Sequence, residues 1–398
     1  MKFDLKSSNW WGPPKKFSTD FEDRKVSWLE LFYDLVYVIA IAKITHHLSE
    51  DLSLNNLFVF VYFFVMIFWG WLNGSLYHDL HGTTGIRTRL MTLWQILIVA
   101  ALVIVIDFSR ADAVFNITIV LMIMQVYITY LWWSVGIYDK YHRKLNRPYT
   151  VFYLLSFALL FASLYVEPQY LWMVFYTTLV LNYLPPFVSV AFLGRNASAF
   201  TLSSSMSERM GLFTIIIFGE VMSGVITGVG HLEELNTMVW VYFTLAVFIV
   251  FGLWWLFFTL ISDVRCKSGY LKSSMLELLY IPTLLALGLM GMAFSGLFAS
   301  YGQAPGEWLS FNVIFGFSLA LFLLGIATMM RLLNYPKQVG PAIFKVQLTL
   351  FSVAIAVLLL TFVQLHLSLF AYLSLLLTLL LVLNFIVNYY RHSLEVKQ

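Results

Sequence analysis

Twelve runs of predominantly apolar residues, each long enough to cross a lipid bilayer, follow one another along the 398-residue chain. A bilayer core about 30 Å thick needs roughly 20 apolar residues in a helix. Inside lipid only helices and closed barrels satisfy their backbone hydrogen bonds, and these runs are too long and continuous for barrel strands. The sequence therefore predicts an all-α polytopic integral membrane protein with helices at approximately 26–48, 57–80, 90–109, 112–139, 149–166, 170–193, 207–229, 237–262, 275–300, 309–331, 342–362 and 367–390.

Composition excludes the other broad classes. Hydrophobic residues make up 60% of the chain and charged residues 11%, whereas a soluble domain carries about 25% charged residues. A net charge of +3 without a basic stripe does not favour nucleic-acid binding. The single cysteine, Cys266, excludes an intrachain disulfide and a Cys-based metal cluster. The expected partner is the lipid bilayer, and we expect no cofactor, no metal and no nucleic acid.

The distribution of charge orients the predicted helices. If the N-terminus is cytoplasmic, alternate connections place all of the 24 Lys and Arg on the cytoplasmic side except Lys43 and Arg110. The opposite side is acidic, with Glu50, Asp51 and Glu167 among its residues. This asymmetry follows the positive-inside rule and predicts twelve transmembrane helices with both termini in the cytoplasm. The basic cluster around Arg143 and Arg147 has a second interpretation, which is attraction of anionic lipid headgroups.

An even number of helices allows two halves of parallel orientation. Trp71 precedes Asp79 by eight residues, and Trp255 precedes Asp263 by the same interval. We therefore predict two six-helix repeats, related by a pseudo-twofold axis along the membrane normal. The predicted parts are a cytoplasmic segment at 1–25, a first half at 26–193, a cytoplasmic linker at 194–206, a second half at 207–390 and a cytoplasmic tail at 391–398.

Two carboxylates in the first predicted helix carry most of the functional inference. Counting from Val26, Glu30 lies about 6 Å and Asp34 about 12 Å along the helix. Their i,i+4 spacing places both on one helical face. An ionised group in the membrane costs about 2.5–3.5 kcal/mol even on the most lenient scale. Both carboxylates are therefore expected to face the interior of the helix bundle.

The seventh predicted helix supplies a second set of charges. Glu208 and Arg209 lie at its cytoplasmic end, and Glu220 lies about 18 Å further along, near the middle of the membrane. Gly224 and Gly228 follow with the spacing that lets another helix approach closely. Two interpretations stay open: a static clamp between Arg209 and the first helix, or an ion or proton pathway along the buried acids.

Uncharged polar residues inside the predicted helices are expected to bridge neighbouring helices. They are Asn73, Gln95, Gln125 and Asn182. His78, Asp79 and His81 are of types that bind metals, but their place near the end of a helix favours a solvated loop. The pair Pro185-Pro186 and the lone Pro282 are expected to kink their helices and to free backbone carbonyls.

The charged motifs resemble those of the bacterial low temperature requirement protein A family. The similar segments are Trp28-Leu-Glu30-Leu-Phe-Tyr-Asp34 and Glu208-Arg209-Met-Gly-Leu-Phe-Thr-Ile-Ile-Ile-Phe-Gly-Glu220. The resemblance implies a multi-pass protein of the bacterial inner membrane and leaves its substrate open, because the family is named for growth in the cold. Members often carry an acid shortly after a Trp pair, whereas here the first acid after Trp255 is Asp263.

We expect a transporter or channel for a small ion or solute. Its pathway would use Glu30, Asp34, Glu208, Arg209 and Glu220. One alternative is a membrane enzyme that modifies lipid, in which the carboxylates act as acid and base. The other is a non-catalytic sensor or assembly factor linked to cold growth. The sequence contains no recognised catalytic motif and does not specify a substrate, a coupling ion or an oligomeric state.

Overall fold

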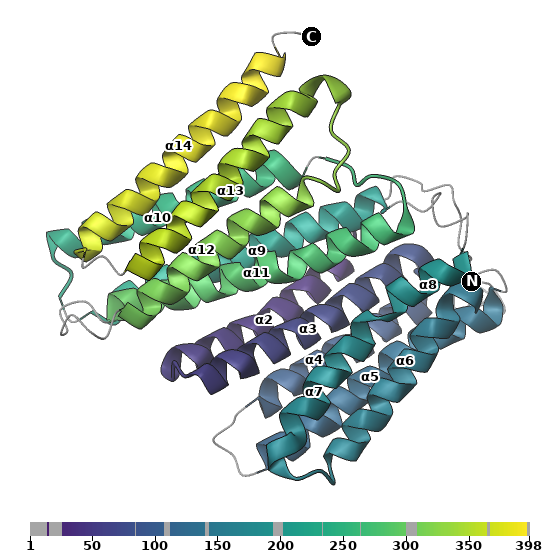
Figure 1. The fold of residues 1–398 in the computed structure, drawn as a ribbon. Helices are drawn as coiled ribbons and strands as arrows, with labels where there is room; N and C mark the ends of the chain where they lie inside the picture. The colour runs from purple at the N-terminus through teal and green to yellow at the C-terminus, as the bar shows by residue number, and fades with distance from the viewer. Residues whose placement is uncertain are drawn as a thin grey trace, which may run out of the picture. The chain divides into compact units, whose positions relative to one another are not determined.

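The computed structural model describes residues 14–15, 26–83, 85–106, 112–139, 143–193, 202–232, 234–262, 264–299, 309–363 and 367–395. The regular secondary structure within these ranges is helical, apart from one isolated bridge between Cys266 and Leu333. The helices (Figure 1) are α2 (Trp28–Glu50), α3 (Leu54–His81), α4 (Ile86–Val105), α5 (Ala113–Tyr138), α6 (Arg143–Ser163), α7 (Leu171–Tyr183), α8 (Pro185–Leu193), α9 (Ser204–Gly230), α10 (Thr237–Phe257), α11 (Tyr270–Ala299), α12 (Leu309–Met329), α13 (Gly340–Val363) and α14 (Leu369–Glu395).

Ten segments of the described chain are long and apolar enough to cross a membrane. Helices α7 and α8 together form one of them, Leu171–Phe192. The helices α2 and α6 are long but lie outside this group, and each carries several charged residues. The prediction of an all-α polytopic protein is confirmed, while the count of twelve crossings and the cytoplasmic termini stay predictions.

The chain forms two compact units. The first consists of Met1–Ile44, Leu54–Arg209 and Ser268–Ser274, and the second of Thr45–Ser53, Met210–Lys267 and Met275–Gln398. Helices α2, α9 and α11 each contribute residues to both units. The predicted duplication is not tested by this division. Of the residues that suggested it, Trp71 is buried, Trp255 is 42% exposed, and Asp263 lies outside the described residues.

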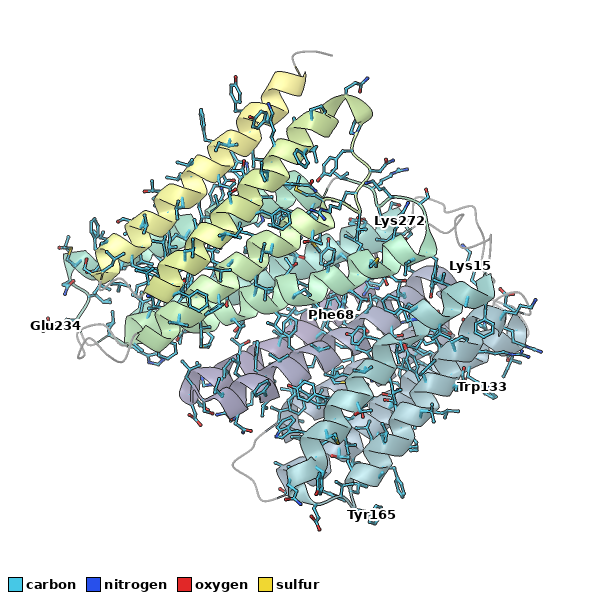
Figure 2. The ribbon with its side chains drawn as sticks, in the orientation of Figure 1. Lys15, Phe68, Trp133, Tyr165, Glu234 and Lys272 are labelled. Atoms are coloured by element: carbon cyan, nitrogen blue, oxygen red, sulfur yellow. The ribbon has the colours of Figure 1, made fainter. Side chains whose placement is uncertain are left out.

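In the first unit, α5 packs against α4 and α6, and α6 packs against α7 and α8. Trp133 and Tyr165 lie toward opposite ends of this layer of helices (Figure 2). Helix α3 contacts α4, α5 and α7 and is buried along most of its length.

The four polar residues predicted to bridge helices do so. Gln95 of α4 donates to the Tyr37 hydroxyl of α2 at 2.9 Å. Gln125 of α5 and Asn182 of α7 exchange hydrogen bonds of 3.0 and 3.2 Å. The fourth, Asn73 of α3, accepts hydrogen bonds from side chains of α5 and α6. Because a buried amide needs partners, each one fixes which helices are neighbours.

The proline pair ends one helix and begins the next. Helix α7 ends at Tyr183 and α8 begins at Pro185. Since Pro186 has no N–H, the carbonyl of Asn182 four residues earlier loses its helical donor. The Trp69 indole of α3 donates to that carbonyl at 3.2 Å. The break therefore anchors α7 to α3. Helix α11, by contrast, runs on through Pro282.

In the second unit, α9 approaches α11 closely, as its glycine spacing predicts. A Cβ at Gly224 would collide with the backbone carbonyl of Gly291. A Cβ at Gly228 would lie 2.9 Å from the Cα of Ser295. The same unit packs α12 against α13, and α14 against both α10 and α13.

Candidate functional site

A buried ion pair within the first unit joins α2 to the first turns of α9. The Nη2 atom of Arg209 lies 2.5 Å from Oδ1 of Asp34, and its Nε donates to Oδ2 at 3.4 Å. Both side chains are 0% exposed. Two parallel donors on one carboxylate give this pair the fork geometry that favours arginine over lysine.

Glu30 has one oxygen in a helix cap and the other near the arginine. The Ser27 N–H and hydroxyl both donate to Oε2 of Glu30 at 2.8 Å, and the Glu30 N–H donates to the Ser27 hydroxyl at 3.4 Å. This reciprocal arrangement is a capping box that begins α2. The Oε1 atom of Glu30 lies 3.7 Å from Nη1 of Arg209. A single side chain thus both starts the helix and belongs to the charge cluster.

Aromatic side chains enclose the arginine. Its guanidinium carbon lies 5.5 Å from the ring centre of Tyr33 and 6.0 Å from that of Trp71. The Trp71 indole also donates to Oδ1 of Asp34 at 2.6 Å. Helix α3 therefore supplies both an aromatic wall for the cation and a donor for the anion.

Behind the ion pair, a second layer joins α2, α3 and α4. The Tyr33 hydroxyl donates toward the carbonyls of Gly70 and Trp71 at 3.3 Å, and Gln95 donates to the Gly70 carbonyl at 2.9 Å. A Cβ at Gly74 would collide with the Tyr33 hydroxyl and the Gln95 amide. Glycine is therefore required where these two side chains cross the α3 backbone.

Two carboxylates flank one guanidinium in a site where Glu30 is 5% exposed. The Nη1 group of Arg209 has no hydrogen-bond partner among the described residues. Removing a charge from such a buried cluster is costly, so its members act together.

Two of the predicted site residues lie outside this cluster. Glu208 is exposed, although its neighbour Arg209 is fully buried, so the two side chains leave α9 in different directions. Glu220 is half-buried and belongs to the second unit. Its participation in the same pathway stays a prediction.

The expectation of a solvated loop at His78 and His81 is wrong. Both are buried on α3, where His78 contacts the Thr92 hydroxyl at 3.1 Å and His81 contacts the Lys15 carbonyl at 2.8 Å. Their polar side chains near the predicted helix end at 80 suggested solvation, but α3 runs to His81 and its last turn is packed inside the protein.

A second polar contact joins α3 to the start of α9. The Asp79 carboxylate accepts hydrogen bonds from the hydroxyls of Ser203, at 2.5 Å, and Ser205. The described residues contain no group of three His, Cys, Asp or Glu side chains that would suit a metal ion. The candidate site is thus a charge cluster of carboxylate, guanidinium and aromatic groups.

Comparison with known proteins agrees with the charged motifs. Residues 25–387 match the family described as bacterial low temperature requirement A protein (LtrA). The chain is also 27% identical over 223 residues to an uncharacterized protein, RA0937, of Rhizobium meliloti (strain 1021), a match that covers 52% of each chain. It thus aligns with about half of that relative's length. The resemblance is confirmed: this multi-pass membrane protein belongs to the bacterial low temperature requirement A family.

Proposed function

We propose that the protein moves a small ion or solute across the bacterial inner membrane and that the cluster of Glu30, Asp34 and Arg209 responds to protons. The observation that carries the proposal is that two buried carboxylates share one arginine. Such intramembrane charges are costly and commonly mark ion or proton routes. Both termini would lie in the cytoplasm.

The proposed step is an exchange of partners. Asp34 holds Arg209 as long as it is ionised. A proton on Asp34 removes the charge that holds the guanidinium, and Glu30 then becomes the nearest carboxylate, 3.7 Å from Nη1. Because Glu30 also caps α2 through Ser27, a shift of its carboxylate toward Arg209 would loosen the first turn of that helix. Proton binding would in this way be coupled to the position of α2 against α9.

A static clamp in a sensor or assembly factor is the second candidate. The observation that favours it is the complete burial of Asp34 and Arg209, together with the Trp71 hydrogen bond to the same carboxylate oxygen. In that case the ion pair fixes how α2 and α9 pack against each other and binds no transported proton.

Proton flux in proteoliposomes separates the two candidates. Purified protein would be reconstituted with a trapped pH indicator, and flux would be driven by cation and amino-acid gradients in turn. The transport proposal predicts flux that Asp34→Asn abolishes, while Glu208→Gln, a change at the exposed neighbouring acid, preserves it. If the unaltered protein moves no proton, cation or amino-acid-sized solute, the proposal fails and the clamp is favoured.

A further inference from the structure

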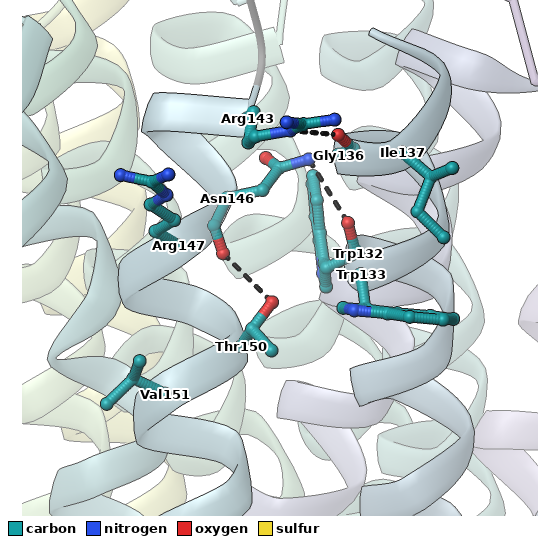
Figure 3. A pocket seen from close by; sticks show the side chains of 9 residues that line it. All are labelled: Trp132, Trp133, Gly136, Ile137, Arg143, Asn146, Arg147, Thr150 and Val151. Atoms are coloured by element: carbon teal, nitrogen blue, oxygen red, sulfur yellow. Dashed lines mark hydrogen bonds between the residues drawn. The ribbon is translucent and has the colours of Figure 1, made fainter. Parts of the chain in front are cut away.

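A groove lies between the last turns of α5 and the first turns of α6, apart from the ion-pair cluster. Its volume is about 310 Å³, and both helices line it (Figure 3). From α6 come Arg143, Asn146 and Arg147, and from α5 come Trp132 and Trp133. One end of the groove is therefore cationic, and its walls are aromatic and apolar.

The two arginines are available for an anion. Arg143 uses its Nε to donate to the Gly136 carbonyl at 2.8 Å, and its terminal nitrogens bond to no other described residue. Arg147 is exposed and makes no ion pair within the described part of the chain. The two cations stand at i and i+4 on one helical face, where like charges repel each other. A phosphate between them would relieve that repulsion and match the guanidinium geometry.

A buried hydrogen-bond acceptor in the same groove limits which ligands the groove can bind. Asn146 is 2% exposed, and its Nδ2 donates to the Trp132 carbonyl at 3.2 Å. That bond fixes the orientation of the amide, because only the nitrogen can face a carbonyl oxygen. Its Oδ1 is buried and has no hydrogen-bond partner among the described residues. A ligand that satisfies this atom must carry a hydrogen-bond donor next to its anionic group.

The apolar residues that line the groove favour a lipid over a free anion as its ligand. Trp133, Ile137 and Val151 line the groove and are 51%, 48% and 55% exposed. Helix α5 is one of the membrane-length helices, and tryptophan beside arginine at the end of such a helix marks the headgroup level. Apolar side chains at that depth would contact acyl chains, whereas a free phosphate would gain nothing from them.

We propose that this groove binds one phospholipid whose headgroup carries a hydrogen-bond donor. Arg143 and Arg147 hold the phosphate, and Oδ1 of Asn146 accepts from the ammonium or hydroxyl of the headgroup. Trp133 and Ile137 contact the chains. The site does not depend on the proposed transport function, because it shares no residue with the ion-pair cluster.

Native mass spectrometry of the full chain in detergent tests the proposal. Dioleoyl phosphatidylethanolamine and dioleoyl phosphatidylcholine have the same chains and the same net charge, but only the first has a headgroup donor. We expect the ethanolamine lipid to bind about tenfold more tightly. Equal binding of the two lipids would overturn the role of Asn146, and displacement of the lipid by millimolar inorganic phosphate would show a free-anion site instead.

A pair of variants tests the arginines. The double variant Arg143→Gln/Arg147→Gln should weaken binding of the ethanolamine lipid about tenfold or more. Lys144 is an exposed cation in the same turn of α6, but it does not line the groove. The affinity of Lys144→Gln for the ethanolamine lipid should therefore stay within about twofold of that of the unaltered chain. An equal loss in both would mean general attraction to a basic surface and would contradict the site. Should the double variant not fold, the two-lipid comparison on the unaltered chain still decides.

Discussion

The Nη2 atom of Arg209 lies 2.5 Å from Oδ1 of Asp34, although 175 positions separate the two residues in the chain. The contact joins the second turn of α2 to the first turns of α9, in a site that excludes solvent. An ion pair so far from water contributes little net stability when intact, but removing one partner leaves a buried charge without compensation.

Asp34 and Arg209 should therefore behave as a coupled pair in unfolding experiments. Arg209→Gln should lower the free energy of unfolding by about 3–5 kcal/mol, because it leaves the buried Asp34 carboxylate without its cationic partner. Asp34→Asn should cost less, since Glu30 remains 3.7 Å from the guanidinium. The double variant should be more stable than the sum of the single losses predicts. Denaturant titration in mixed micelles measures all three.

The exposed neighbour Glu208 is the matched control for that cycle. Glu208→Gln should change the free energy of unfolding by no more than about 0.5 kcal/mol, as is usual for an exposed side chain. Strictly additive losses in the double variant would mean that Asp34 and Arg209 do not interact in the membrane, and the site described above would then be wrong.

Two tryptophans of α3 allow a comparison between a charged and a neutral acceptor. Trp71 donates to the Asp34 carboxylate at 2.6 Å, and Trp69 donates to the Asn182 carbonyl at 3.2 Å. Both side chains are buried, so Trp→Phe removes a similar volume at each position. Because hydrogen bonds to charged groups are the stronger ones, Trp71→Phe should cost about 1 kcal/mol more than Trp69→Phe. An equal or smaller cost, measured by the same titration, would contradict the charge on Asp34.

The lengths of the apolar runs in the sequence predicted where helices occur but not at which residues they end. The fifth predicted helix begins at 149, whereas α6 begins at Arg143, and the last helix runs to Glu395 instead of 390. The criterion of about 20 apolar residues per helix corresponds to the thickness of the hydrocarbon layer of the membrane. A helix continues past that layer as long as its backbone can hydrogen-bond, so polar end turns such as that of Arg143 were assigned to loops.

The candidate site was predictable only in part for a related reason. The free-energy cost of a charge in lipid predicted that Glu30 and Asp34 face the bundle interior. The pairing of Arg209 with the first helix was one of two open interpretations. The capping box of Ser27 and Glu30 is also visible in sequence as Ser-x-x-Glu, although Ser27 was treated as part of an apolar run. Trp71 could not be predicted, since its contact with Asp34 depends on how a third helix packs.

Asn73 should be the most sensitive of the bridging amides. Its Oδ1 accepts from the Trp132 indole at 2.9 Å and from the Tyr153 hydroxyl at 2.7 Å. Asn73→Leu keeps the volume but leaves both buried donors unpaired, at about 1–3 kcal/mol for each group. Tyr153→Phe removes one donor and leaves Asn73 bonded to Trp132, so it should cost about 0.5–1.5 kcal/mol. If Tyr153→Phe proved the more damaging change in unfolding titrations, Asn73 would not be the shared acceptor.

Two glycines of α9 should respond in opposite directions to the same substitution. Gly219→Ala places a methyl group where no atom lies within 4 Å, and removing backbone freedom from a helix should raise stability by up to about 1 kcal/mol. Gly224→Ala brings the same gain in helix propensity. Its methyl group, however, collides with the Gly291 carbonyl of α11, and a backbone carbonyl cannot rotate aside as a side chain can. The helices must then separate, and the net loss should be about 1–3 kcal/mol. Folded yield after purification and unfolding in mixed micelles would both report the difference. A neutral Gly224→Ala beside a neutral Gly219→Ala would show that α9 and α11 do not pack backbone to backbone.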